Sequence, residues 1–590
     1  MIASKGNRPT VQLDSGWRFQ LDQDDIGECE QWYLPAHDFG AWAEITVPSA
    51  WDYFCSAMWG YEGIAWYAAD VTASLFPDHF HQRLEFQRVN YHAKVWLNGH
   101  YLGQHVGGDL PFSFDFTNEI ISPARNILIV RVDNTPKLDQ SPYGTVIERV
   151  MYGGIVRPVF IQALPDISIE SANITPELAD QGVRVAARIS LHNRRASPAE
   201  VSLTIALDNG QQFSWTVSCP PNQTSHQEFA FEITTPVLWS PQQPHLYRAD
   251  LTLMEANRII DSYTTRFGIR KIEVKNGRIL LNGEAIQIRG VNRYDEYAPY
   301  GLTVPIELVR KDLELVKASG FNLIRVHYPQ EGTTLDIMDE LGIMLMEEIY
   351  INWWGAKFLH DYVPPEENAD VVLAGGKQML SETIQRHHNH PCVVMWSVGN
   401  ESATETPTGI AIFRELIQHA KMLDKTRLVT YAACGDIVAN EAFDVADLVC
   451  TNLYPATFEP NPIHHFSELQ EKVARPLSDE LEKICRRFKG KPIIMSEYGT
   501  HGVPGIRGDI RFSEDMQAAY IQTAWKTITS IPEMQGGILW CWADYYHRRN
   551  LIGKGFMFHA AFGPFGLVTV DRKPKAALKA VAEMFGASSD

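Results

Sequence analysis

Two glutamates directly follow apolar segments, where a folded sheet would hold a carboxyl group at its edge. Glu401 comes after the segment WSVGN at 396–400, and Glu497 comes after IIMS at 493–496. A pair of carboxyl groups can cleave a glycosidic bond: one protonates the leaving oxygen while the other attacks the anomeric carbon or activates water. A separation of about 5–5.5 Å is typical of retention, and about 6.5–9.5 Å of inversion. If only one of these glutamates were present, a salt bridge in a loop would be the simpler explanation than a catalytic role.

Other apolar segments also end in polar and aromatic residues. The residues concerned are His327, Asn400, Tyr454 and Trp540. Their recurrence beside the two glutamates makes a shared site a stronger interpretation than isolated loop contacts. Tyr454 and Trp540 could also be ordinary core residues, because large aromatic side chains often fill cores.

These residues would share one face if the segments after residue 271 form a parallel barrel. Eight short apolar segments alternate there with helix-like stretches or long loops. The segments are 286–291, 322–326, 343–347, 393–398, 428–431, 448–452, 493–496 and 537–542. Apolar strands separated by helices are typical of a parallel sheet covered on both faces. Eight such units predict a (β/α)8 barrel, whose catalytic groups lie at the carboxyl ends of the strands.

The first 271 residues have a different pattern. Short alternating strands are separated by turn residues such as Asn98-Gly99, which indicates antiparallel sheets. The strands begin again near Leu164-Pro165, and about seven follow before residue 271. That number and length fit an immunoglobulin-like β-sandwich. We therefore predict domains at 1–165, 166–271 and 272–590.

The composition narrows the possible partners. The 590 residues include 52 Lys and Arg against 71 Asp and Glu, a net charge of −19. Nucleic acid and anionic membranes attract clustered Lys and Arg, so we expect neither as a partner. No apolar run approaches the roughly 20 residues of a membrane span, and the first residues lack the apolar stretch of a secretory signal. Eight scattered cysteines without a CxxC pair fit reduced thiols, so we expect a cytoplasmic protein.

Three histidines near residue 388 invite a metal-site interpretation that we set aside. His387, His388 and His390 precede the fourth barrel segment, so they should lie toward the opposite face from the chemistry. A metal-dependent barrel hydrolase would need several ligands at the strand ends, and only His327 is a histidine there. We expect no metal and no cofactor. The pair Glu347-Glu348 stays open between a supporting role and a cation site.

Motifs along nearly the whole chain resemble glycoside hydrolase family 2, which holds β-galactosidases, β-glucuronidases and β-mannosidases. The motifs are VWLNG at 95–99, HVGG at 105–108, LWSP at 238–241, GVNR at 290–293, RVHYP at 325–329, WSVGNES at 396–402 and SEYG at 496–499. The segments 492–499 and 539–544 and the tail DRKPK at 571–575 are similar to the β-glucuronidase branch. The resemblance implies an amino-terminal β jelly roll of the galactose-binding type before the sandwich and the barrel.

The resemblance also implies roles for the residues at the strand ends. Glu401 matches the acid/base of the family, and Glu497 matches its nucleophile. Asn400 matches the residue that holds the sugar 2-hydroxyl. His327, Tyr454 and Trp540 match members of the sugar pocket, where Tyr454 would donate to the nucleophile and Trp540 would lie beneath the ring. The implied activity is a retaining exo-β-glycosidase that acts on a carbohydrate or glycoconjugate and forms a homo-oligomer, a dimer or a tetramer.

One departure concerns the sugar. The β-glucuronidases carry an Asn-x-Lys pair before the DRKPK tail, which binds the sugar carboxylate, whereas this chain has Gly563-Pro564-Phe565. A buried carboxylate without a cation is costly, so we expect a neutral β-hexoside, a β-galactoside above all, with Phe565 near C6. The alternative is a β-glucuronidase or β-galacturonidase that uses another cation: Arg325, Arg549 or Lys554.

Two further alternatives remain at this point. Glu148 falls where relatives reach an acidic side chain into the pocket, so it either binds sugar hydroxyls or forms a surface salt bridge. A catalytically inactive carbohydrate-binding relative would also keep the pocket. The presence of both Glu401 and Glu497 counts against inactivity.

Overall fold

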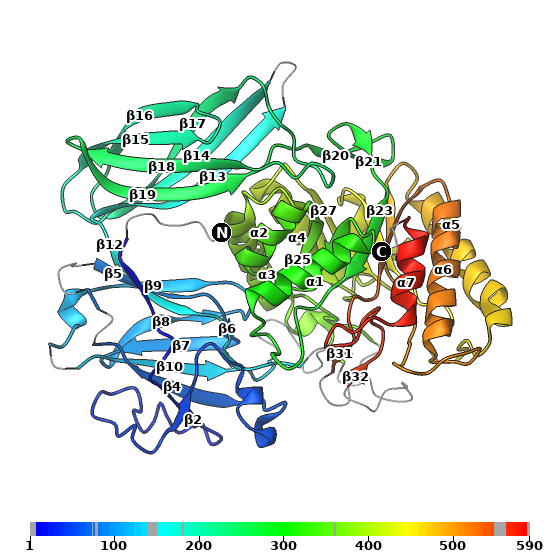
Figure 1. Ribbon diagram of the computed structural model, residues 1–590, viewed down its shortest axis with the longest axis horizontal. Helices are drawn as coiled ribbons and strands as arrows, with labels where there is room; N and C mark the ends of the chain where they lie inside the picture. The colour runs from blue at the N-terminus through cyan, green and yellow to red at the C-terminus, as the bar shows by residue number, and fades with distance from the viewer. Residues whose placement is uncertain are drawn as a thin grey trace.

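Three structural units follow one another along the chain in the computed structural model (Figure 1). The structure describes residues 8–72, 75–76, 81–123, 125–137, 150–178, 182–357, 362–458, 460–547 and 562–586. In Figure 1 the amino-terminal unit is blue, the second unit lies above it in cyan and green, and the barrel lies beside both.

The amino-terminal unit is built from antiparallel sheets. A four-stranded sheet, β1-β12-β5-β9, faces a six-stranded sheet, β3-β2-β4-β10-β7-β8, and β11 pairs with β6. The strands are β1 Thr10–Gln12, β2 Trp17–Leu21, β3 Ala43–Ile45, β4 Ile64–Asp70, β5 His81–Phe86, β6 Val89–Asn90, β7 His92–Leu97, β8 His100–Val106, β9 Phe112–Thr117, β10 Ile127–Asp133, β11 Gly154–Ile155 and β12 Val159–Leu164. The predicted turn at Asn98-Gly99 joins β7 to β8.

The second unit is the predicted sandwich. One sheet has the order β13-β14-β17 and the other the order β16-β15-β18-β19. The strands are β13 Ile167–Leu178, β14 Val183–Asn193, β15 Ala199–Leu207, β16 Gln212–Cys219, β17 Gln223–Ile233, β18 Tyr247–Glu255 and β19 Arg258–Phe267. Along β14, Val183, Val185 and Ala187 are buried while Arg184, Ala186 and Arg188 are exposed. This alternation is what a strand with one face on a core requires.

A closed parallel barrel forms the third unit and confirms the predicted fold class. A small sheet of β20 Ile272–Lys275, β21 Arg278–Leu281 and β22 Glu284–Ala285 precedes it. The barrel strands are β23 Ile288–Asn292, β24 Leu323–Arg325, β25 Met344–Glu348, β26 Val393–Asn400, β27 Leu428–Ala433, β28 Val449–Asn452, β29 Ile493–Tyr498 and β30 Met534–Leu539. They are almost wholly buried, as a parallel sheet covered on both faces should be.

Helices surround the barrel (Figure 1). They are α1 Ile306–Ala318, α2 Gly332–Leu341, α3 Ala369–His387, α4 Pro407–Leu423, α5 Arg475–Arg487, α6 Glu514–Ser530 and α7 Ala576–Met584. Side chains at helical spacing face the strands, such as Val309, Leu313 and Val316 of α1. Among the described residues, no helix combines the length and the apolar character that crossing a membrane needs.

The last barrel strand lies three residues earlier than predicted. The sequence indicated 537–542, whereas β30 is Met534–Leu539 and Trp540 follows it. The reason is Gly536, where a Cβ atom would lie 2.0 Å from the Ile288 carbonyl oxygen on the neighbouring strand. Glycine permits this close approach of two backbones. Because Gly536 and Gly537 have no apolar side chain, a search for apolar runs placed the start of the strand too late.

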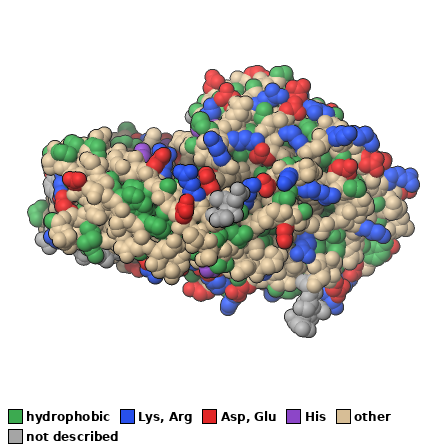
Figure 2. Space-filling view, turned by 90° about the horizontal axis from the view of Figure 1, so that it is seen from above, with side chains coloured by type: hydrophobic (Ala, Val, Ile, Leu, Met, Phe, Trp, Pro, Cys, Tyr) green, Lys and Arg blue, Asp and Glu red, His purple; other side chains and the backbone are tan. Residues whose placement is uncertain are grey.

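The amino-terminal unit reaches the barrel beside its mouth. Arg88 donates to Asp295 at 2.6 Å, and Arg157 contacts Glu331 at 2.5 Å. Asp295 follows β23 and Glu331 follows β24, so both contacts join loops at the carboxyl ends of barrel strands. On the face seen in Figure 2, acidic and basic side chains are interspersed. The net charge of −19 is therefore not gathered into one patch on that face.

Candidate active site

The barrel brings the two glutamates to the same mouth. Glu401 follows β26 directly, and Glu497 is the fifth residue of β29. All barrel strands are parallel, so their carboxyl ends meet on one face. Glu401 has a left-handed backbone, with φ of 44°, at the point where the chain leaves the strand.

Hydrogen-bond donors surround the Glu497 carboxyl group. Arg325 Nη1 donates to its Oε1 at 2.7 Å, and the Tyr454 hydroxyl donates to its Oε2 at 2.6 Å. His327 Nε2 lies 3.5 Å from the same Oε1. The side chain is 5% exposed, and the guanidinium is buried completely. A cation and a phenol thus both donate to one carboxyl group, which acts as the acceptor.

Arg325 itself is held by a second carboxylate. Its Nη2 and Nε donate to Glu348 Oε2 at 2.9 Å and 3.2 Å, and Nη2 also donates to Asn400 Oδ1 at 2.8 Å. Burial opposes ionisation of Glu348, but the charge of Arg325 and the hydrogen bond from His327 together lower its pKa. Glu348 thereby holds Arg325 and His327 against Glu497, which is the supporting role that the sequence left open for this glutamate.

Among the described residues, the donors to Glu401 are neutral. Trp353 Nε1 donates to its Oε2 at 2.9 Å, and Asn452 Nδ2 donates to its Oε1 at 2.8 Å. Burial, followed by the negative charge of Glu497, raises the pKa of Glu401 to about 7, although both donors act in the opposite direction. A carboxyl group with this pKa carries a proton for part of the time at neutral pH and can act as a general acid.

Asn452 connects the two glutamates. It is paired in register with Glu497 across β28 and β29. The Ser496 hydroxyl donates to Asn452 Oδ1 at 2.7 Å, which directs the amide nitrogen toward Glu401. Because Ser496 fixes the orientation of the Asn452 side chain, Asn452 in turn fixes the position of the Glu401 carboxyl group.

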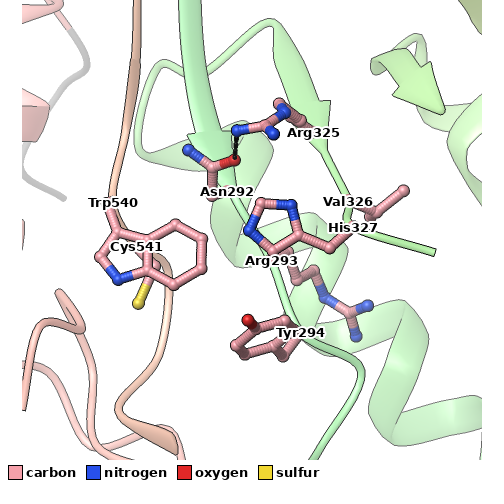
Figure 3. A pocket seen from close by; sticks show the side chains of 8 residues that line it. All are labelled: Asn292, Arg293, Tyr294, Arg325, Val326, His327, Trp540 and Cys541. Carbon is pink, nitrogen blue, oxygen red and sulfur yellow. Dashed lines mark hydrogen bonds between the residues drawn. The ribbon is translucent and has the colours of Figure 1, made fainter. Parts of the chain in front are cut away.

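Aromatic rings form one wall of the mouth. The His327 and Trp540 rings are stacked, with centroids 5.1 Å apart, and Tyr294 meets Trp540 edge-on at 5.5 Å. Figure 3 shows these rings around a small pocket, with Asn292 and Arg325 joined by a hydrogen bond at its upper end. The indole of Trp540 donates to the Tyr545 hydroxyl at 3.1 Å. The wall is therefore apolar on its faces and hydrogen-bonded at its edges.

Comparison with known protein families covers nearly the whole chain. Residues 11–165 match the glycosyl hydrolases family 2 sugar binding domain, residues 167–270 match glycosyl hydrolases family 2, and residues 272–587 match the family 2 TIM barrel domain. The chain belongs to glycoside hydrolase family 2. As a glycoside hydrolase, it has the architecture and the order of domains that the sequence predicted.

Individual relatives of this family 2 hydrolase span its full length. Beta-glucuronidase of Mus musculus is 26% identical over 620 residues, covering 98% of this chain and 91% of that protein. A beta-glucuronidase structure from an uncultured Clostridium sp. is 25% identical, with a TM-score of 0.86 and coverage of 100% and 99%. A GH2 beta-galacturonidase structure from Eisenbergiella tayi bound to galacturonate has a TM-score of 0.85 and covers 100% of both chains at 24% identity, a likeness of fold.

The structure brings most of the predicted site residues of this family 2 hydrolase together. His327 and Tyr454 contact Glu497, and Trp540 stacks on His327. Phe565 is buried with its ring centroid 6.3 Å from that of Tyr454. Glu148, Arg549 and Lys554 lie outside the described residues.

Asn400 is also part of this arrangement. Its Oδ1 accepts from Arg325 and Asn452, and its Nδ2 donates to Asn352 at 2.7 Å. The side chain is thus oriented at the foot of Glu401 by three neighbours. The part played by these residues in substrate binding stays a prediction.

Sequence reasoning missed two supporting residues. Trp353 and Asn452 hold Glu401. Asn452 ends β28, so its place at the mouth could have been read from the sequence. Trp353 lies in the loop after β25 and carries no comparable signal.

The histidines that were set aside as metal ligands contact different partners. His387 Nδ1 lies 3.0 Å from Glu347, His388 Nε2 lies 2.8 Å from Thr175, and His390 Nδ1 lies 2.6 Å from Asp339. Glu347 also accepts from the Gln330 backbone at 3.0 Å, outside the Glu497 cluster. Ligand atoms of Asp336, Asp339 and His390 all lie within 4.8 Å of one another, so the absence of a metal at His390 stays a prediction.

Proposed function

We propose that this family 2 hydrolase is a retaining exo-β-glycosidase that acts through a covalent glycosyl-enzyme. The observation that carries the proposal is the contrast between the two carboxyl groups. Glu401 has neutral donors and a pKa of about 7, whereas Glu497 is bound by the Arg325 guanidinium and the Tyr454 hydroxyl. One group is suited to donate a proton and the other to attack as an anion.

In the first step, Glu497 forms a bond to the anomeric carbon as the glycosidic C–O bond breaks, and Glu401 gives its proton to the leaving oxygen. In the second step, Glu401, now a carboxylate, takes a proton from water. The water oxygen bonds to the anomeric carbon, and the bond to Glu497 breaks. Two inversions at the same carbon return the β-configuration.

For the sugar, we propose a terminal β-uronide, a β-glucuronide or a β-galacturonide. The relatives named beta-glucuronidase and beta-galacturonidase support this alternative better than the neutral hexoside favoured by the sequence. A neutral β-galactoside is the second candidate, because Phe565 places a buried ring beside Tyr454. We no longer propose Arg325 as the cation that binds the uronate carboxylate, because Glu348 and Glu497 already bind its guanidinium.

A panel of p-nitrophenyl β-glycosides tests both the activity and the sugar. The glucuronide, galacturonide, galactoside, glucoside, mannoside, fucoside and xyloside should be assayed side by side, with kcat/KM as the measured quantity. We expect one of the two uronides to exceed every neutral sugar by at least about tenfold, the ratio that 1.4 kcal/mol provides. A larger kcat/KM for the galactoside would contradict the uronide proposal. The first product anomer, observed by NMR, should be β.

We also propose a cytoplasmic homo-oligomer, a dimer or a tetramer. All eight cysteines lie in described parts of the chain and are free thiols, which agrees with a reducing compartment. Light scattering after size-exclusion chromatography would measure the oligomeric state, and a monomeric mass would contradict this part of the proposal.

A further inference from the structure

Arg88 of the amino-terminal unit is a buried cation beside the barrel mouth. It lies between β5 and β6 and is 2% exposed. Its Nη1 donates to Asp295 Oδ2 at 2.6 Å, its Nη2 to Asp109 Oδ1 at 2.5 Å, and its Nε to the Gly108 carbonyl at 2.7 Å. Asp109 and Gly108 belong to the same unit as Arg88, whereas Asp295 belongs to the barrel. The guanidinium therefore fixes one barrel residue to the amino-terminal unit.

Asp295 connects two loops of the barrel mouth. It follows β23, and its Oδ1 accepts a hydrogen bond from the hydroxyl of Tyr328, which follows β24. The Asp295 backbone N–H donates to the same hydroxyl at 3.2 Å. The guanidinium carbon of Arg88 also lies 5.9 Å from the centre of the Tyr328 ring. One carboxylate thus accepts from Arg88 at one oxygen and from Tyr328 at the other.

The residues directly before Asp295 and Tyr328 belong to the aromatic wall, which Tyr294, His327 and Trp540 form. The Tyr294 ring is stacked on the Tyr328 ring, with centroids 6.0 Å and planes 5° apart, and it meets the His327 ring at 5.8 Å. Figure 3 shows Tyr294 beside His327 and Trp540. Because Tyr294 is joined to Asp295 through one peptide bond, a shift of Asp295 would move this ring of the wall.

The wall in turn reaches the proposed nucleophile. His327 Nε2 lies 3.5 Å from Glu497 Oε1, and Trp540, stacked on His327, is the residue predicted to lie beneath the sugar ring. The position of the wall therefore determines where a bound sugar lies relative to Glu497. A misplacement of about 1 Å between reacting groups can cost about 100-fold in rate, even when its origin is distant.

Apolar packing covers the same junction of the two units. Tyr91 and Met151 of the amino-terminal unit form one buried cluster with Tyr328 and Tyr350 of the barrel. This cluster does not depend on Arg88, so we expect the two units to stay together without the guanidinium. Removing one partner of a buried ion pair leaves an uncompensated charge, which would disturb the loops that carry the wall.

We infer that Arg88 is a positioning residue of the active site, which holds the aromatic wall in place through Asp295 and Tyr328. The inference rests on the proposed glycosidase function and applies whichever sugar the enzyme prefers. Arg88 acts through these two residues rather than on the substrate. A guanidinium suits this task because its planar, rigid set of donors can bind several acceptors in fixed directions, which a lysine ammonium cannot match.

The test uses the full-length enzyme and the p-nitrophenyl β-glycoside that the parent enzyme prefers. Arg88→Ala removes the cation, Arg88→Lys keeps the charge, and Tyr328→Phe removes only the hydroxyl that donates to Asp295. Arg157→Ala is the matched control, because Arg157 is another buried arginine of the amino-terminal unit that pairs with a barrel residue, Glu331. Thermal melting checks folding, and Tyr328→Phe serves if Arg88→Ala does not fold.

We expect kcat/KM to fall about 10- to 100-fold in Arg88→Ala, the effect of losing a hydrogen bond between charged groups. KM should rise by at least about threefold, whereas a smaller fraction of folded enzyme would lower kcat and leave KM unchanged. Arg88→Lys should recover part of the loss, and Tyr328→Phe should lose about 3- to 10-fold. Arg157→Ala should change kcat/KM by less than about threefold.

A double variant separates positioning from a general loss of stability. Tyr294→Ala removes the wall ring nearest in sequence to Asp295. If Arg88 acts through the wall, Arg88→Ala should lower kcat/KM by less than about threefold further in the Tyr294→Ala background, although effects at independent sites would add in free energy. An equal fold-loss from Arg88→Ala in both backgrounds, or a loss in kcat with KM unchanged, would overturn the inference.

Failure of this inference can be told from failure of the proposed function. If the parent enzyme hydrolyses a β-glycoside but Arg88→Ala behaves like Arg157→Ala, Arg88 does not position the wall, and the proposed function stands. If the parent enzyme hydrolyses no glycoside of the panel, the proposed function fails and this inference fails with it. A preference for neutral hexosides would overturn only the proposed sugar.

Discussion

The ends of β26 and β29 hold the same type of residue in opposite surroundings. Glu401 receives hydrogen bonds from an indole and an amide, whereas Glu497 receives them from a guanidinium and a phenol. Burial raises the pKa of Glu401 to about 7, and the charge of Glu497 adds to the effect. The comparison shows that two residues of one type, at the ends of two strands of one barrel, differ in burial and in hydrogen-bond donors, and the proposed roles of proton donor and nucleophile rest on that difference.

The most severe test of this contrast is Glu497→Ala. We expect turnover to fall by about 100,000-fold or more, the size of loss seen when a catalytic nucleophile is removed. The covalent step needs an anion beside C1, and alanine removes the carboxyl group that accepts from Arg325 Nη1 and from the Tyr454 hydroxyl. Single-turnover assays with a 2,4-dinitrophenyl glycoside measure the loss. Activity on that substrate equal to that of Glu401→Ala would void the difference between the two glutamates.

Glu401→Ala should lose less, and its loss should depend on the leaving group. General acid catalysis contributes about 100- to 10,000-fold, and a 2,4-dinitrophenolate leaves without a proton. We therefore expect a large loss on alkyl glycosides and partial activity on the dinitrophenyl glycoside. Azide should restore turnover and give a β-glycosyl azide, identified by NMR. An α-glycosyl azide would reverse the assignment of roles.

Tyr454→Phe should lower the activity that depends on Glu497 without abolishing it. The variant loses one hydrogen bond to a charged group, worth about 1.5–3 kcal/mol, so kcat/KM should fall about 10- to 150-fold. Tyr520→Phe is the matched control, because the Tyr520 hydroxyl donates to the Pro455 carbonyl and contacts neither glutamate. Equal effects in the two variants would show that the Tyr454 hydroxyl has no special action on Glu497.

The smallest expected effect is on the pH profile. Glu401 acts in its protonated form, so with a pKa of about 7 the protonated fraction, and with it kcat/KM, should fall as the pH rises through 7. The Trp353 hydrogen bond lowers the pKa of Glu401. Trp353→Phe should therefore raise that pKa and move the basic limb to higher pH. If the basic limb of the profile stays in place or moves to lower pH in Trp353→Phe, that limb reports the titration of a group other than Glu401.

The position of both glutamates could be predicted because of how a parallel barrel is built. Each follows an apolar segment, and all such segments in a parallel barrel end at one face. The same logic located His327, Tyr454 and Trp540 near the mouth, even though β30 begins earlier than the apolar pattern indicated. The neutral sugar expected from Gly563-Pro564-Phe565 is less well supported, since a motif of three residues carries no information about the side chains that other segments bring to the same place.

The sequence by itself determined the fold class, with antiparallel sheets before residue 271 and eight apolar strands of a parallel barrel after it, because these follow from local periodicity and turn chemistry. Only the tertiary structure decided which side chains meet. Arg325 and Glu497 are 172 residues apart, and Asn452 and Glu401 are 51 apart. Hydrogen bonds and ion pairs depend on separations near 3 Å, which the packing of eight strands sets and no local pattern records. The raised pKa of Glu401 is therefore a property of the fold.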